Sequence, residues 1–182
     1  DGTGAEPVRA DVAINGDKVI AVGHLPVEAA RTIDATGLVV SPGFIDLHAH
    51  SDISFLVDPL ADSKLRQGVT LELLGNCGMS FCAPMNDKTL GSFRSWAKRS
   101  SPDLEPTWTS FAGYLNALEQ AGSVINIATQ VGHNQIRSFV MGDVARAPSA
   151  DELLDMERNV VEALEAGAMG LSTGLYFAPG SY

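Results

Sequence analysis

Short apolar runs separated by turn residues fill the first forty positions of the chain. The runs at 10–14 and 18–23 flank the segment Asn-Gly-Asp, a hairpin signal because Asn and Gly accept positive φ angles. The segment 31–40 adds a strand, a glycine break and another strand. This pattern predicts a small antiparallel β unit over residues 1–42.

After this unit, strand patterns alternate with helix patterns. Strands are predicted at residues 43–48, 69–75, 123–132 and 168–175. Helices are predicted at residues 109–122 and 149–167, with a short helix as an option within 58–68. A loop rich in Ser, Pro and charged residues is expected over 84–107. Such alternation is typical of parallel βα units.

The two longer helices carry apolar residues at helical spacing. In the first, these residues fall at i, i+3, i+4 and i+7, at Phe111, Tyr114, Leu115 and Leu118. The second begins with a capping box of Ser149 and Glu152 and is expected to end at Gly167. Its residues expected to face inward are Leu153, Met156, Val160 and Leu164.

About four βα units can be counted, and they predict an α/β fold of the TIM-like (β/α)8 barrel type. A closed barrel takes roughly 250 residues, so residues 43–182 would form about its first half. An open doubly wound sheet is the alternative, but no G-x-G-x-x-G motif follows a predicted strand. Because the sequence stops directly after a strand, we interpret it as a fragment.

The composition is that of a folded domain, with 45% hydrophobic and 19% charged residues. A formal net charge of −10 disfavours nucleic acid and anionic membranes as partners. No apolar stretch approaches the roughly 18 residues of a membrane span, and the first residues lack the pattern of a signal peptide. With two cysteines, a disulfide framework is disfavoured, and we expect a cytoplasmic protein.

Two of the four histidines, His48 and His50, stand one residue apart where a predicted strand ends. Side chains alternate along a strand, so both imidazoles should point the same way, with Asp46 and Phe44 on their face. The residues expected to face the surrounding helices are Ile45, Leu47 and Ala49. Active sites of barrels form at the C-terminal ends of strands, and two imidazoles at this spacing can bind one divalent metal ion. The alternative is a pair of partly solvated polar residues.

The next strand ends in the segment Gly-Asn-Cys-Gly, which brings Cys77 to the same end of the predicted barrel. A thiolate is a strong zinc ligand, and its position between glycines in a loop favours that role over a buried structural cysteine. Cys82 lies further along among apolar residues and is expected in the core. A disulfide between the two cysteines is the less favoured alternative.

His133 follows the third strand of the predicted barrel, with Arg137 beyond it. The position suits the rim of an active site, and it favours a hydrogen-bonding residue that orders a loop over a metal ligand. Asp46 and Asp52 are candidates to hold the metal-bound imidazoles in their tautomers. Asp52 could equally cap a helix.

Several segments together resemble the amidohydrolase superfamily and, more narrowly, the D-aminoacylases, or N-acyl-D-amino-acid deacylases. They are "ADVAINGDKVIAVG", "ARTIDATGLVVSPGFIDLHAHSD", "GVTLELLGNCGMSFCAP", "VGHNQIR" and "GAMGLSTGLYFAPGSY". The resemblance implies a metal-bearing barrel joined to a small β domain that both chain ends build. It also implies that Cys77 binds one tightly held zinc ion, and that His48 and His50 face an optional second, weaker metal position.

The same resemblance places the remaining machinery outside this sequence: two further histidine ligands, an aspartate general base and a substrate-binding arginine. The family often carries a tyrosine three residues before the glycine of the last Pro-Gly pair, where this chain has Phe177. Tyr176, one residue earlier, and His133 are therefore the candidate catalytic residues. The chain has no lysine after Lys98, which argues against relatives whose two metals are bridged by a carboxylated lysine.

The implied activity is zinc-dependent hydrolysis of small-molecule N-acyl-D-amino acids to a D-amino acid and a carboxylate. Residues 1–182 alone are expected to be inactive. The alternatives are a hydantoinase-like or dihydroorotase-like enzyme for cyclic amides or dipeptides, and a non-catalytic barrel fragment. A homo-oligomer is left open.

Overall fold

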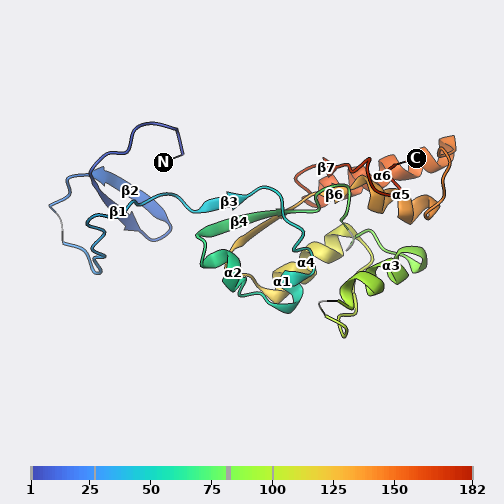
Figure 1. Ribbon diagram of the computed structural model, residues 1–182, viewed down its shortest axis with the longest axis horizontal. Coiled ribbons are helices and arrows are strands. Elements are labelled where there is room, and N and C mark those ends of the chain that lie inside the picture. Colours follow the sequence, from blue (N-terminus) through green and yellow to red (C-terminus); the bar gives the residue numbers. More distant parts are fainter. Residues whose placement is uncertain (1, 27, 81–82, 100, 182) are drawn as a thin grey trace. The chain divides into compact units, whose positions relative to one another are not determined.

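The computed structural model describes residues 2–26, 28–80, 83–99 and 101–181, and the chain divides into two compact units, Asp1–Pro42 and Gly43–Tyr182. The first unit contains an antiparallel hairpin of β1 (Asp11–Asn15) and β2 (Lys18–Gly23) (Figure 1). Asn15 lies opposite Lys18, and Gly16 takes a φ of 62°, so the hairpin prediction is confirmed.

The strands expected within 31–40 do not form in the described part of that segment. Its apolar side chains, such as Ile33 and Val39, are exposed in this unit. A β pattern becomes a strand only when a second strand pairs with it, and the two strands present here already pair with each other.

The second unit is built on parallel strands. β3 (Phe44–Asp46), β4 (Val69–Leu74) and β5 (Asn126–Thr129) form one sheet in chain order. β6 (Val131–Gly132) and β7 (Leu171–Ser172) form a second parallel pair. The segment 123–132, expected as one strand, is therefore divided into β5 and β6. β5 pairs with β4 and β6 pairs with β7, and the change of partner falls at Gln130.

Helices connect these strands. They are α1 (Ser54–Val57), α2 (Asp62–Leu65), α3 (Asp87–Ala97), α4 (Phe111–Ala121), α5 (His133–Met141) and α6 (Ala150–Ala166). Figure 1 shows α1, α2 and α4 on one face of the three-stranded sheet. No helix in the described ranges is both long and apolar enough to cross a membrane.

Two helices differ from the sequence predictions. The segment 84–107 contains α3, which the Asn86 side chain caps by accepting from the Lys88 and Thr89 amides, and which buries Phe93 and Ala97. The serines, the glycine and the charged residues between these apolar positions obscure the helical spacing, so the sequence pattern predicted a loop. α5, which was not predicted, begins at His133 directly after β6, so no loop separates that residue from the strand.

The two predicted longer helices are confirmed as α4 and α6. Phe111, Tyr114 and Leu118 are buried on α4. The capping box of α6 forms as predicted, and Gly167 ends the helix in a left-handed conformation. Its inward face is narrower than predicted, because Met156 and Ala163 are buried whereas Leu153 and Leu164 are exposed.

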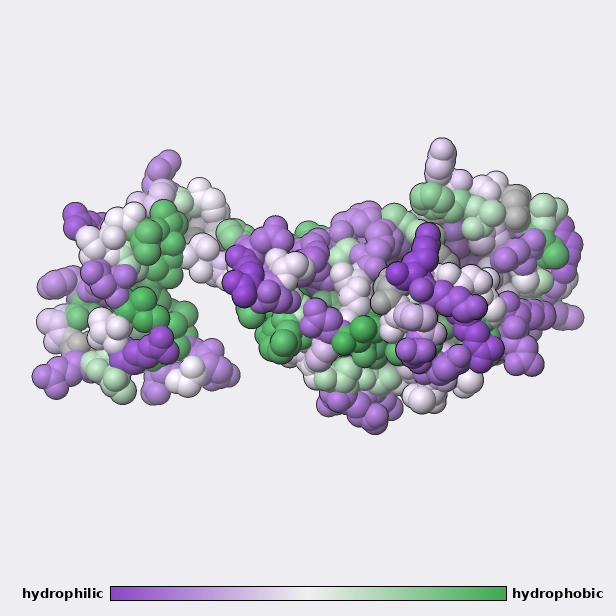
Figure 2. Space-filling model, turned by 60° about the horizontal axis from the view of Figure 1, so that its bottom comes forward, coloured by the Kyte–Doolittle hydropathy of each residue, from purple (hydrophilic) through white to green (hydrophobic). Residues whose placement is uncertain are grey.

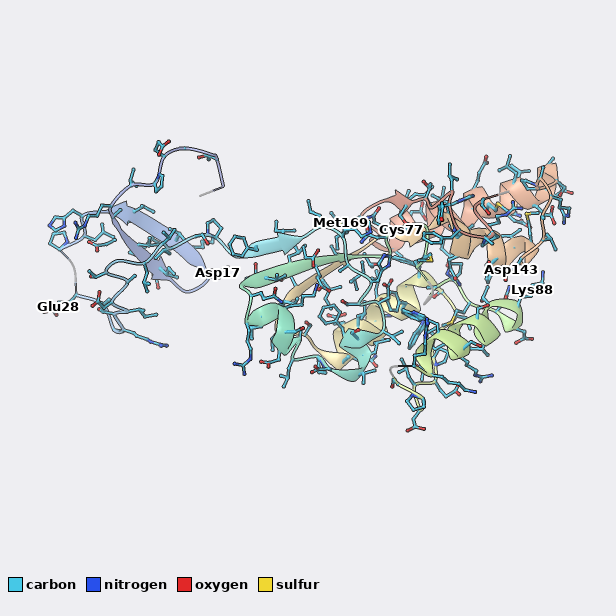
Figure 3. The ribbon with its side chains drawn as sticks, in the orientation of Figure 1. Asp17, Glu28, Cys77, Lys88, Asp143 and Met169 are labelled. Carbon is cyan, nitrogen blue, oxygen red and sulfur yellow. The ribbon has the colours of Figure 1, made fainter. Side chains whose placement is uncertain are left out.

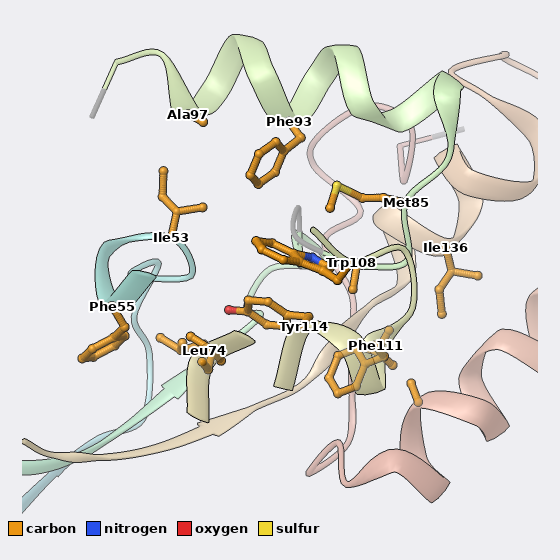
Figure 4. Close-up of a cluster of buried hydrophobic side chains, with 14 of the residues drawn as sticks. Ile53, Phe55, Leu74, Met85, Phe93, Ala97, Trp108, Phe111, Tyr114 and Ile136 are labelled. Carbon is orange, nitrogen blue, oxygen red and sulfur yellow. The ribbon is translucent and has the colours of Figure 1, made fainter. Parts of the chain in front are cut away.

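The main core lies between the helices and the covered face of the sheet. Figure 4 shows the side chains of Leu74, Tyr114, Trp108 and Phe93 layered between β4 and α3. The rings of Trp108 contact those of Phe93 and Tyr114, with centroids 6.2 and 5.8 Å apart. This packing fixes β4, whose C-terminal end leads into the loop of Cys77.

Candidate metal centre

A bulge after β3 orients the two histidines. Asp46 lies opposite Glu72 of β4, so a regular strand would place Ala49 opposite Gly75. The Ala49 amide instead donates to the Leu73 carbonyl over 3.3 Å, which is the bond made by a residue opposite Leu74. The β3 side therefore carries one extra residue, and one extra residue inverts the alternation of side chains. Ala49 is consequently buried on the helix-covered face with Leu74.

This bulge corrects the predicted faces of the strand. The Asp46 carboxylate lies 2.6 Å from Lys64 of α2, on the covered face, and not on the face of the histidines. Ile45 and Leu47, expected against helices, are 58% and 68% exposed. Asp46 Oδ1 also accepts the main-chain N–H of His48 over 3.1 Å, which closes the bulge.

The loop after β4 holds Cys77 in a tight turn. Cys77 adopts a left-handed φ of 58°, and Gly75 and Gly78 on either side have φ values of 71° and 73°. The Asn76 amide donates to the Ala49 carbonyl over 3.1 Å and to the Leu73 carbonyl over 2.7 Å. One side chain thus ties the cysteine loop to the histidine segment.

These two segments bring three ligand-type side chains together. His48 Nε2 lies 3.2 Å from Cys77 Sγ, and one ligand atom from each of His48, His50 and Cys77 lies within 4.8 Å of the others. The imidazole rings meet edge to face, with centroids 5.5 Å apart. Figure 3 shows Cys77 beyond the end of β4.

The donor set fits a zinc ion. Two imidazoles and a thiol are nitrogen and sulfur donors of the kind that zinc prefers, and the span of their atoms matches one coordination sphere. Partial burial, and then the charge of His48, lower the pKa of His50, which favours the neutral imidazole that binds metal ions.

The two candidate carboxylates have other partners than expected. In the described part of the chain, Asp46 bonds Lys64 and a backbone amide, and Asp52 Oδ1 accepts the Gly75 amide over 3.2 Å. Neither binds an imidazole ring. The N-cap of α1 is Ile53, so Asp52 does not cap that helix either. Burial, reinforced by the charge of Glu72 and opposed by two backbone amides, raises the pKa of Asp52 to about 7.

The remaining predicted residues lie outside this three-residue cluster. His133 is the first residue of α5, and its Nδ1 is buried without a hydrogen-bond partner among the described residues. Arg137 is buried and donates to the Val144 and Arg146 carbonyls. Tyr176 is 89% exposed and stacks edge to face on Phe177. Cys82 lies outside the described residues.

The sequence predictions missed the residues that support the cluster. Lys64 joins Asp46 to Glu72, and Ser172 reaches the Cys77 loop from β7. No spacing rule signals these partners, because Ser172 lies 94 residues from Gly78 in the chain and Lys64 reaches the two strands from α2.

Comparison with known proteins decides the family. The family model described as "Amidohydrolase family" matches residues 31–180. The chain belongs to the amidohydrolase family. This amidohydrolase is 42% identical over 182 residues to N-acyl-D-glutamate deacylase of Alcaligenes xylosoxydans xylosoxydans. The matched region is 99% of this chain and 36% of the relative. It thus spans about a third of the length of the curated relatives that it matches.

Solved structures agree with this amidohydrolase over its whole length. One is the crystal structure of N-acyl-D-glutamate deacylase from Bordetella bronchiseptica, complexed with zinc and a phosphonate inhibitor that mimics the tetrahedral intermediate. It has a TM-score of 0.85 and 38% identity, over 100% of this chain and 37% of that one. Another, of a D-aminoacylase studied for its binuclear metal centre, has a TM-score of 0.83 and 39% identity, over 100% and 38% of the two chains. The chain therefore has the amidohydrolase fold over the part of these deacylases that it covers.

Proposed function

We propose that this amidohydrolase takes part in the zinc-dependent hydrolysis of the amide bond of N-acyl-D-amino acids, giving a D-amino acid and a carboxylate. The observation that carries the proposal is the convergence of His48, His50 and Cys77 within 4.8 Å. The deacylases to which the chain is similar, one of them crystallised with zinc, support the same reaction class.

In this proposal the three side chains hold the metal ion at the open end of the parallel strands. Cys77 contributes a thiolate from a rigid turn, and His48 and His50 contribute neutral imidazoles from the bulge after β3. When bound, zinc supplies a Lewis acid and lowers the pKa of a coordinated water towards about 7. Tyr176 and His133 stay candidates for contact with the substrate, and the general base is assigned to the part of the relatives' length beyond Tyr182.

The substrate class can be tested with the protein extended over the length of its relatives. We expect the zinc-loaded protein to release free amino groups from N-acetyl-D-glutamate or N-acetyl-D-leucine, with the L enantiomers as controls. Faster hydrolysis of hydantoins or dipeptides would instead place the protein among the cyclic-amide or dipeptide hydrolases.

The ligand assignment has its own measurement. Cys77→Ala should abolish tight zinc retention, measured as metal content after dialysis against a chelator, because the variant lacks the thiolate. Ser92→Ala, at an exposed position of α3, is the control that leaves the three donor atoms in place. Unchanged zinc content in Cys77→Ala would refute the assignment.

A further inference from the structure

Ser172 holds both ends of the turn that carries Cys77. Its hydroxyl accepts the Gly78 amide over 2.9 Å and donates to the Gly75 carbonyl. These are the groups on either side of the Asn76–Cys77 pair, so one hydroxyl closes the turn from outside. Ser172 belongs to β7, which is 94 residues away in the chain from Gly78.

A second residue of this segment, Gly174, contacts Cys77 itself. Gly174 lies so close to the cysteine that a Cβ on it would stand 1.9 Å from the Cys77 carbonyl oxygen. Asn134, at the start of α5, holds this segment in place by donating to the Gly174 carbonyl over 3.1 Å. The segment after β7 therefore has a fixed position against the cysteine loop.

The turn requires such support because its conformation is strained. A left-handed backbone disfavours a residue with a Cβ, and Cys77 adopts this conformation with a φ of 58°. Residues keep such conformations when the surrounding structure holds them there. If the turn relaxed, the sulfur would leave its position 3.2 Å from His48 Nε2.

We infer that Ser172 is a positioning residue for Cys77 as a metal ligand. Its oxygen both accepts and donates within the turn, so it acts through the cysteine backbone and not by contact with a substrate. The inference rests on the metal site of the proposed function. It adds that the affinity of the site depends on a hydroxyl of β7 as well as on the three ligands.

The test measures metal binding and its spectroscopic signature. Zinc affinity is determined by competition with a chromogenic chelator, and cobalt(II) is added to follow thiolate-to-cobalt charge-transfer absorption. Ser172→Ala should weaken zinc binding by roughly 10–100-fold, the usual effect of removing a group that orients a ligand. It should also shift the cobalt spectrum, while circular dichroism shows a folded protein.

Two variants make the result specific. Ser172→Thr keeps a hydroxyl at the same position and should restore zinc affinity to within a few-fold of the parent. Thr173→Ala changes the exposed neighbour and should bind zinc as the parent does. A merely structural role would lower the unfolding temperature of Ser172→Ala and leave the cobalt spectrum unchanged.

The outcomes separate this inference from the proposed function. If Cys77→Ala loses zinc and Ser172→Ala binds it as tightly as the parent, the positioning role is overturned and the metal site stands. If Cys77→Ala retains zinc, the metal site itself fails. Loss of affinity in Ser172→Ala together with rescue by Ser172→Thr supports the inference.

Discussion

Glu72 carries a charged side chain with no exposed surface. Its carboxylate lies 2.5 Å from Lys64 Nζ, which also binds Asp46, so one cation serves two carboxylates beneath the bulge of the histidines. A buried ion pair contributes little net stability, yet removing one partner is strongly destabilising because a charge remains buried alone. The main effect of Lys64 is therefore to pair the buried carboxylate of Glu72, and its net contribution to stability is small.

Replacing this lysine should destabilise the second unit. Lys64→Met should lower the free energy of unfolding by about 3 kcal/mol, measured by urea denaturation. The double variant Lys64→Met/Glu72→Leu should recover most of this loss, because it removes the isolated buried charge. Arg66→Met breaks an exposed pair with Asp62 and should change stability by less than about 1 kcal/mol. Equal losses in the two single variants would contradict the role of Lys64.

At the residue scale, spacing at the ends of two predicted strands, together with the family resemblance, made His48, His50 and Cys77 the candidate ligands, and the structure brings these three side chains together. His48 and His50 share a face because they are two positions apart in an extended segment, and Cys77 follows the end of the next strand. The predicted faces of Asp46 and Ile45 were wrong, because the extra residue between Asp46 and Ala49 leaves no mark in the pattern of polar and apolar residues. Ser172 was not predicted as a partner of the loop, because the contact depends on how β7 lies against it.

At the element scale, local signals determine which helices could be predicted. The N-terminus of α6 is defined by reciprocal hydrogen bonds between Ser149 and Glu152, and Arg146 adds two contacts to the glutamate carboxylate at 2.7 and 2.6 Å. These residues lie within seven positions of one another, so the sequence displays them. α5 lacks a side-chain cap at Gly132, and the segment within 31–40 lacks a partner strand, so neither could be predicted correctly.

The cap of α6 should give the protein an acid-sensitive contribution to stability. Hydrogen bonds from Arg146, and then from the Ser149 backbone, lower the pKa of Glu152 to about 2 from its ordinary 4.5. A lowered carboxyl pKa stabilises the fold above about pH 4.5, and this contribution is lost as the pH falls towards about 2.

Comparison with Glu152→Gln isolates this contribution. The parent should unfold at a higher temperature than the variant at pH 7, and the gap should close between pH 4.5 and 2. Thermal melts followed by circular dichroism measure both. Glu157→Gln, at an exposed position on the same helix, should give no comparable gap. A gap that stays constant over this pH range would show that the charge of Glu152 is not its cause.

At the scale of the whole molecule, each unit exposes apolar side chains that folded domains normally cover. In the first unit these include Ile14, Ile20 and Val39, and Figure 2 shows hydrophobic residues gathered on its visible surface. In the second, Ile45 and Leu47 lie on the open face of the sheet. A two-stranded hairpin is marginal by itself, and contiguous apolar surface leads to association.

Residues 1–182 alone should therefore associate. Light scattering after size-exclusion chromatography should show species larger than one chain, with dye binding that reports exposed apolar surface. Val39→Lys, at a position 85% exposed, should reduce both signals, because a charge within an exposed apolar segment opposes association. Lys18→Ala, at an exposed polar position on the hairpin, should not. A stable monomer that binds no dye would contradict this expectation.

The same preparation tests where catalysis resides. The three candidate ligands are present in residues 1–182, so the chain should bind zinc, and this binding should depend on Cys77. Hydrolysis needs in addition a base, groups that orient the substrate and a site that excludes water, and the proposed function assigns the base to the part of the relatives' length beyond Tyr182. We expect zinc binding without release of D-amino acids from N-acyl substrates. Deacylation by these residues at a rate comparable to the protein of its relatives' length would show that they hold the complete catalytic apparatus.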